Sequence, residues 1–184
     1  MKKNLLLICL IILTLAFNAM AQTTKTETPM AKSEDVSSID AIMKAVYDVI
    51  SGDAGQKRDW DRFRILFHKD ARLIPVGKNP TTKIVGARAF TPEEYIERSS
   101  PFMEKEGFFE KEIARRTDLY GNIAQVFSTY ASYHKADDKT PFARGINSFQ
   151  LLNDGKRWWV LTIYWQGETP ETPIPKEFLK SKKS

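Results

Sequence analysis

From residue 108 to residue 166, large apolar and polar residues alternate with the period of two that is typical of β-strands. The pattern predicts four strands at about 108–119, 123–134, 142–152 and 157–166. They are separated by the turn signals "YGN", "KADDKTP" and "NDGK". Because two of these turns are short, neighbouring strands are expected to run antiparallel.

The first half of the chain follows helical spacing instead. Apolar residues recur every three or four positions from Ile39 to Ile50, with Ser37 or Ser38 as the cap and Gly52 as the stop. A second helix is predicted near "RDWDRFRILF", a short strand at "ARLIPVG", and a third helix in "TPEEYIERSSPFMEKEG", capped by Thr91. Helices followed by antiparallel strands predict an α+β fold in which the helices pack on one face of a curved sheet.

The last predicted strand has bulky side chains on both of its faces. Strict alternation places one set on each face: Trp158, Val160, Thr162 and Tyr164 on the first, and Trp159, Leu161, Ile163 and Trp165 on the second. A sheet with one solvated face needs only one apolar set. The sequence therefore predicts that something covers the second face.

The N-terminus has the pattern of a secretory signal peptide. Lys2 and Lys3 precede an apolar run, and Ala19-Met20-Ala21 is a small-residue cleavage signal, so residues 1–21 are expected to be removed and the protein exported to the periplasm or secreted. The alternative, a membrane anchor, is disfavoured because the run is shorter than about 18 residues. Residues 22–37 are polar and are interpreted as a disordered leader, followed by one domain at 38–167 and a tail at 168–184.

Charge and cysteine content narrow the possible functions. The net charge is +5, of which Lys2 and Lys3 supply two and "KEFLKSKKS" at the C-terminus supplies three, so residues 22–175 sum to zero. This distribution argues against a nucleic-acid partner, whose binding face would carry the positive charge. The single cysteine, Cys9, lies in the signal peptide, so the mature chain can form neither a disulfide nor a cysteine metal site.

The order of elements, "LFHKDARLIPVG" and "NDGKRWWVLTIYWQ" resemble the nuclear transport factor 2-like superfamily, in its SnoaL-like and ketosteroid-isomerase-like branch. The resemblance spans residues 38–167. It implies a cone, in which a bent antiparallel sheet wraps around three helices and encloses a pocket. It also implies that the outer face of the sheet pairs with a second subunit. Trp159, Leu161, Ile163 and Trp165 would then form a homodimer face, unless the C-terminal segment folds back over them.

Strand pairing predicts the residues that line the pocket. The candidates share an inward position on the predicted strands and are Asn147, Tyr130, Tyr164, Arg115, Ser128, Thr162, Trp158 and Phe149. A few polar groups among apolar walls suit a small apolar or amphipathic ligand. For Arg115 an alternative is an ion pair with Glu112 or Glu110.

The resemblance also implies an isomerase site, which this sequence does not reproduce. Aligned on Phe67 to Ala71, the catalytic base falls near Ile74, the helical tyrosine near Ala45 with Tyr47 two residues away, and the second acid at Asn147. An isoleucine cannot accept a proton, so that chemistry is disfavoured.

No cofactor or metal site is expected, because His68 and His134 are the only histidines and neither lies in a ligand motif. Three functions stay open: a ligand-binding domain; a lyase, isomerase or hydrolase using Tyr130, Asn147, Arg115 or a histidine; and a dimerisation module whose pocket is filled by its own side chains.

Overall fold

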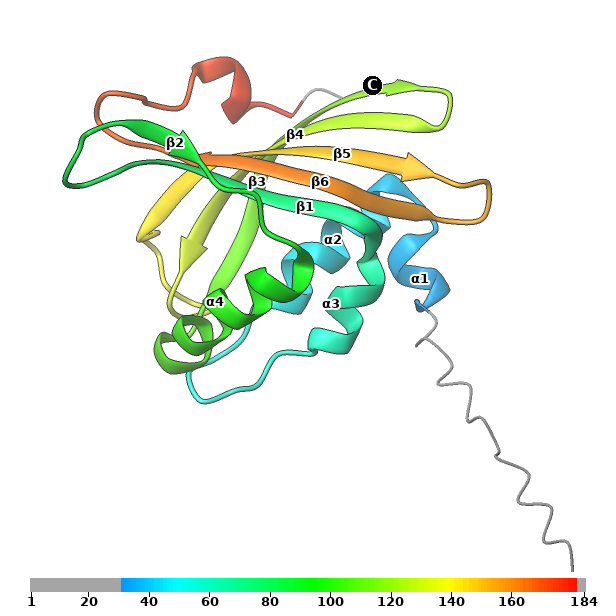
Figure 1. Ribbon diagram of the computed structural model, residues 1–184, viewed down its shortest axis with the longest axis horizontal. Coiled ribbons are helices and arrows are strands. Elements are labelled where there is room, and N and C mark those ends of the chain that lie inside the picture. The colour runs from blue at the N-terminus through cyan, green and yellow to red at the C-terminus, as the bar shows by residue number, and fades with distance from the viewer. Residues whose placement is uncertain (1–30, 182–184) are drawn as a thin grey trace, which may run out of the picture.

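A computed structural model describes residues 31–181. Helices cover one face of a six-stranded sheet, and the chain beyond the last strand crosses the other face (Figure 1). The elements are α1 (Ser33–Val36), α2 (Ile39–Ile50), α3 (Trp60–Leu66), β1 (Phe67–Lys78), β2 (Val85–Ala87), α4 (Pro92–Glu106), β3 (Phe109–Tyr120), β4 (Ile123–Tyr133), β5 (Ala143–Asn153), β6 (Trp158–Gly167) and the 3₁₀ helix η1 (Lys176–Leu179). The predicted α+β order is confirmed, with α1, β2 and η1 as additions.

The local signals explain where the helices begin. Ser38 accepts a hydrogen bond from the amide of Ala41 at the start of α2. At the start of α4, Thr91 and Glu94 form a capping box, each side chain bonding the other's backbone amide. The strands from 108 onward lie within one or two residues of their predicted bounds.

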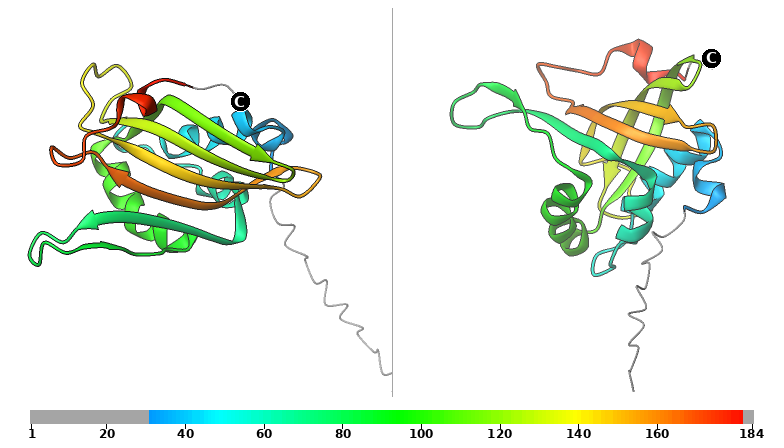
Figure 2. Two further views of the ribbon diagram at one scale, coloured as in Figure 1. Left: turned by 90° about the horizontal axis from the view of Figure 1, so that it is seen from above. Right: turned by 45° about the vertical axis from the view of Figure 1, so that its right-hand side comes forward.

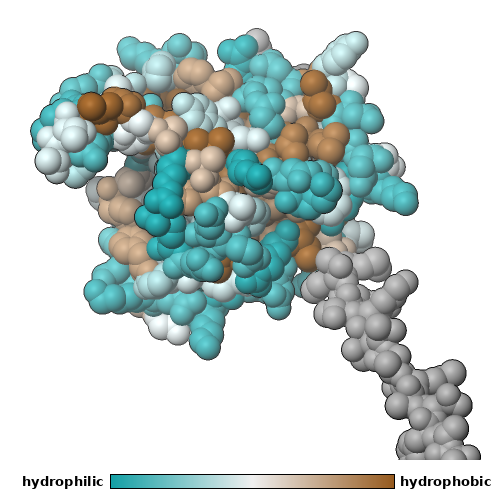
Figure 3. All heavy atoms as spheres, viewed as in Figure 1, coloured by the Kyte–Doolittle hydropathy of each residue, from teal (hydrophilic) through white to brown (hydrophobic). Residues whose placement is uncertain are grey.

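The sheet is mixed rather than antiparallel throughout. Its strand order is β2-β1-β6-β5-β4-β3, and β1 runs parallel to β6. The intervening β2, α4, β3, β4 and β5 provide the long connection that a parallel pair requires. β1 is also longer than predicted. With β2 it forms a narrow arm that extends past the body of the domain (Figure 2). Figure 3 shows hydrophobic atoms at the end of this arm, where Ile84 and Val85 are 69% and 61% exposed.

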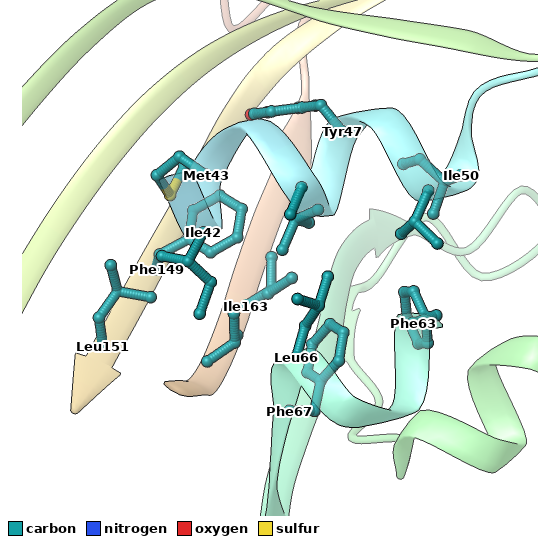
Figure 4. Close-up of a cluster of buried hydrophobic side chains, with 14 of the residues drawn as sticks. Ile42, Met43, Tyr47, Ile50, Phe63, Leu66, Phe67, Phe149, Leu151 and Ile163 are labelled. Carbon is teal, nitrogen blue, oxygen red and sulfur yellow. The ribbon is translucent and has the colours of Figure 1, made fainter. Parts of the chain in front are cut away.

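The core lies between α2, α3 and the concave face of the sheet. Ile42 and Met43 of α2 are fully buried and lie near Phe149 and Leu151 of β5, while Phe63 and Leu66 of α3 close the other side (Figure 4). The burial of large apolar side chains from both layers supplies the main stabilisation of the fold. The hydroxyl of Tyr47 points away from this apolar cluster, toward the sheet.

One prediction about the ends of the domain needs correction. Residues 33–37, assigned to a disordered leader, are ordered, since Asp35 of α1 accepts two hydrogen bonds from Arg62 at 2.8 and 2.7 Å. The tail after residue 167 packs on the outer face, where Phe178 lies against Phe127 with ring centroids 5.4 Å apart. Thr129 donates a hydrogen bond to the Phe178 carbonyl in the same region. The signal peptide and residues 22–30 lie outside the described residues.

The orientation predicted for β6 is correct only up to Leu161. A bulge there leaves Leu161 without a partner on β5, because Val160 pairs with Leu151 and Thr162 pairs with Gln150. An extra residue turns every later side chain to the opposite face. Ile163 and Trp165 therefore face the helices rather than a partner, and Thr162 and Tyr164 face outward rather than the pocket.

Among the described residues, no helix is both long enough and apolar enough to cross a membrane.

Candidate functional site

A cavity of about 440 Å³ lies between α2, α4 and the concave face of the sheet. Its walls are mostly apolar and aromatic, with contributions from Phe63, Leu73, Phe149, Ile163 and Trp165. A group of polar side chains comes from two helices and three strands: Tyr47, Tyr95, Glu110, Tyr130, Ser132 and Asn147. A hollow of this size with a few convergent polar groups is the usual form of a small-molecule site.

Among the described residues, Glu110 of β3 is the only acidic one that lines this cavity. Its carboxylate accepts hydrogen bonds from the Ser132 hydroxyl at 2.9 Å and from the Asn147 amide at 3.4 Å. Burial raises the pKa of Glu110 from 4.5 to about 7, although these two hydrogen bonds act in the opposite direction. A carboxyl group in this state can both release and accept a proton near neutral pH.

Tyr47 reaches the same cluster from α2. Its hydroxyl lies 2.7 Å from the Ser128 hydroxyl and accepts a hydrogen bond from the Asn147 amide at 3.1 Å. Ser128 in turn donates to Glu112 at 2.5 Å. Because the Ser128 hydroxyl donates its hydrogen bond to Glu112, the hydroxyl proton of Tyr47 must point to Ser128, away from the cavity. Tyr47 therefore orients Asn147 and does not donate to a ligand.

Tyr130 of β4 differs from Tyr47 in having no hydrogen bond from its hydroxyl to another described residue. No fully buried side-chain polar atom in the described part lacks a partner, so the Tyr130 oxygen is not fully buried, and Tyr130 lines the cavity. Its ring lies over Gly145, where an added Cβ would stand 2.5 Å from the Tyr130 oxygen. Burial, together with the charge of Glu110, raises the pKa of Tyr130, so the group is a hydrogen-bond donor at neutral pH.

Arg115 belongs to a second, fully paired arrangement next to the cavity. Its guanidinium donates to Glu112 at 2.8 and 2.5 Å and also pairs with Asp40 of α2. The ion pair with Glu112 is one of the two alternatives that the sequence left open for Arg115. It leaves Arg115 outside the cavity lining, so an anion-binding role there is not supported.

The predicted pocket residues thus separate into three groups. Asn147, Tyr130 and Phe149 line the cavity, and their binding of a ligand stays a prediction. Ser128, Arg115 and Trp158 face the helices but do not line it, and Thr162 and Tyr164 lie on the outer face. Neither His68 nor His134 lines the cavity, although the ring of His134 stacks on that of the lining residue Phe142 with ring centroids 4.3 Å apart. Within residues 31–181, no three His, Cys, Asp or Glu side chains are grouped closely enough to hold a metal ion.

Sequence reasoning missed Glu110 and misplaced Tyr47. A bulge at Ile113 changes the facing of β3, since Glu112 pairs with Tyr130 and Ala114 pairs with Thr129. Glu110 and Glu112 therefore face inward, whereas Ile113 is 43% exposed. The sequence feature that could have indicated Glu110 is its position directly after the apolar "GFF" segment. Ile74, aligned with the isomerase base, lies opposite Tyr164 on the outward side of β1.

No protein-family model matches the chain, and no curated protein matches it in sequence. Solved structures do share its fold. A protein of unknown function with a cystatin-like fold from Nostoc punctiforme aligns with a TM-score of 0.54 and 12% identity over 74% of this chain and 92% of that one. A candidate calcium/calmodulin dependent protein kinase II association domain from Xanthomonas campestris aligns with a TM-score of 0.51 and 15% identity over 72% and 86%.

An NTF2-like protein of unknown function from Shewanella baltica aligns with a TM-score of 0.46 and 15% identity over 70% of this chain and 89% of that one. At such identities the likeness is one of fold alone. The chain therefore shares a cystatin-like α+β fold.

Proposed function

We propose that the protein binds a small, largely apolar molecule in the cavity and holds a carbonyl or hydroxyl group of that molecule between Tyr130 and Glu110. The observation that carries the proposal is the contrast within the lining: aromatic and aliphatic walls surround one buried cluster of polar groups. An apolar ligand gains by leaving water for these walls. Its polar group needs a partner inside, which the free hydroxyl of Tyr130 supplies.

Asn147 supports this cluster by fixing both neighbours. Its side-chain amide donates to Tyr47 and to Glu110, so the amide cannot rotate without losing one bond. Preorganised partners lower the entropic cost of binding. Asn147 is therefore the residue whose replacement should affect ligand binding most without removing a wall of the cavity.

A ligand screen by thermal shift, followed by calorimetry on each compound that stabilises the protein, tests the proposal. Asn147→Leu should weaken binding of such a compound by about tenfold or more, since it removes a donor and disorders Glu110. Gln150→Leu is the matched control, because Gln150 is an exposed amide on the outer face of the neighbouring part of β5. Equal binding by both variants would refute the assignment of the site.

Acid–base catalysis by Glu110 is the second candidate function. The position of Glu110 in the cavity and its pKa of about 7 favour it, since an effective general base or acid has a pKa near the working pH. For a ligand that is turned over, Glu110→Gln should abolish turnover while the ligand still binds. Retained turnover in Glu110→Gln would exclude this role and leave the binding proposal intact.

The proposed biological unit is a homodimer formed through the outer face of the sheet. Because of the bulge, the apolar residues of β6 on this face are Trp159, Leu161 and Tyr164, and Tyr164 is 48% exposed. The association-domain name of the Xanthomonas campestris structure belongs to that protein, and it motivates the same test here. Tyr164→Glu should convert a dimer to a monomer in size-exclusion chromatography with light scattering, whereas Leu119→Glu at a hairpin end should not. A wild-type monomer would exclude the dimer.

Export is proposed from the N-terminal sequence. Expression of the full chain in a bacterial host should place the protein in the periplasmic fraction or the medium, with Gln22 as its first residue by N-terminal sequencing. Recovery of the uncleaved chain from the membrane fraction would support the anchor instead.

A further inference from the structure

The opening of the cavity has a different chemistry from its interior. Phe102 of α4 and Phe142, which precedes β5, both line the cavity and are 48% and 45% exposed. These two rings therefore lie where the cavity meets solvent. Arg98, one turn before Phe102 on α4, also lines the cavity and is exposed. The opening thus combines an apolar rim with one positive charge.

Arg98 forms no ion pair with any residue of the described part of the chain. Among the described residues that line the cavity, the other charged one is Glu110. The arginines in residues 31–181 that do form ion pairs are Arg62, Arg64, Arg115, Arg116 and Arg144. Glu94, one turn before Arg98, uses its carboxylate to bond Thr91 in the capping box. The charge of Arg98 is therefore available to an anion.

The guanidinium of Arg98 is held in place by an aromatic ring. It lies 5.0 Å from the centre of the Phe90 ring, and the guanidinium of Arg88 lies at the same distance from that ring. Both positive charges lie near one ring, so an anion close to that ring would be attracted by both. A stacked guanidinium also loses less freedom when it binds a carboxylate through two parallel hydrogen bonds.

We propose that the ligand is an amphipathic carboxylic acid whose apolar body fills the cavity and whose carboxylate is bound by Arg98 at the opening. This inference rests on the proposed ligand-binding function and adds the ligand's chemical class. A carboxylate fits better at the opening than in the interior, because the interior already contains the carboxyl group of Glu110 and contains no cation to offset a second one.

The experiment compares 2-naphthylacetic acid and decanoic acid with their primary amides by calorimetry at pH 8. The wild-type protein should bind each acid at least about tenfold more tightly than its amide, because a hydrogen-bonded ion pair is lost in the amide. Arg98→Gln should remove this preference by weakening binding of the acids alone. Arg98→Lys, which retains the charge but not the paired donors, should fall between the two. Arg116→Gln is the matched control on an exposed arginine of β3.

The outcomes separate the two proposals. If the acids and amides bind equally well, in the wild type and in Arg98→Gln, the carboxylate proposal is wrong and the cavity is still a binding site. If neither the acids nor the amides bind, the ligand-binding function and this inference both fail for such compounds. Since Arg98 is exposed, its variants should unfold at the same temperature as the wild type. Measuring this temperature on the same samples separates a loss of binding from a loss of folding.

Discussion

Glu110 and Glu112 are two residues apart on β3, face the same side of the sheet and belong to one hydrogen-bonded network, yet the protein treats them in opposite ways. Glu112 receives Arg115 and the hydroxyl of Ser128. Glu110 receives only the neutral donors of Ser132 and Asn147, and no described cation pairs with it. The chain therefore neutralises one carboxylate with its own arginine and leaves the other beside a cavity.

The difference indicates a structural role for Glu112 and a functional role for Glu110 on the same strand. A carboxylate with its own cation and donors contributes to stability and has no capacity left for a ligand. A buried carboxyl without a cation costs stability when it ionises, and proteins accept such costs mainly at functional sites. The contrast between Glu112 and Glu110 can be tested by three pairs of substitutions.

The largest effect is expected from Arg115→Met. The side chains of Arg115 and Glu112 are only 19% and 20% exposed, so removal of the arginine leaves a partly buried carboxylate without its cation. The free energy of unfolding should fall by about 2–3 kcal/mol, measured by chemical denaturation at pH 7. Arg116→Met, which disturbs an exposed pair with Asp118, should change it by about 0.5 kcal/mol or less. Equal losses would show that the Glu112 pair is not structural.

Glu110→Gln should raise the free energy of unfolding, which is the opposite of the effect of Arg115→Met. The pKa of Glu110 is about 7 in the folded protein and near 4.5 when exposed, so the wild type loses stability as the pH rises from about 4.5 to about 7. The variant lacks this loss. Its advantage in unfolding free energy should therefore grow by about 1–3 kcal/mol between pH 4.5 and pH 8. Glu97→Gln, on the exposed side of α4, is the control, and parallel pH profiles of Glu110→Gln and wild type would contradict the burial of an unpaired carboxyl.

The two tyrosines of the cluster provide the smallest and most direct comparison. Tyr47→Phe removes a hydroxyl that bonds both Ser128 and Asn147, and should cost about 1–2 kcal/mol of unfolding free energy. Tyr130→Phe removes a hydroxyl without such a bond and should cost about 0.5 kcal/mol or less. The ranking should reverse for ligand binding, where Tyr130→Phe is the more damaging change. A large stability loss in Tyr130→Phe would mean that its hydroxyl is already committed.

Much of the site could be predicted from sequence, and the failures have one physical cause. Asn147, Tyr130 and Phe149 lie before any irregularity on β4 and β5, and simple alternation placed them correctly. Ile113 and Leu161 are each the extra residue of a bulge, and each reverses the facing of the residues beyond it. As a result alternation alone does not find Glu110, and it predicts Trp165 on the dimer face instead of in the cavity.

The sequence by itself determined the order of the three main helices and of five of the strands, their bounds to within a few residues, and the α+β class. These depend on interactions between residues close together in the chain: side-chain periodicity, the capping box at Thr91 and the compact turns of the hairpins. Only the tertiary structure decided which side chains of β3 and of the end of β6 line the cavity, and which glutamate pairs with a cation. Both depend on strand pairing and on contacts between residues up to a hundred positions apart, as with Tyr47 and Asn147. No local pattern records such contacts, because they form only when the sheet curves around the helices.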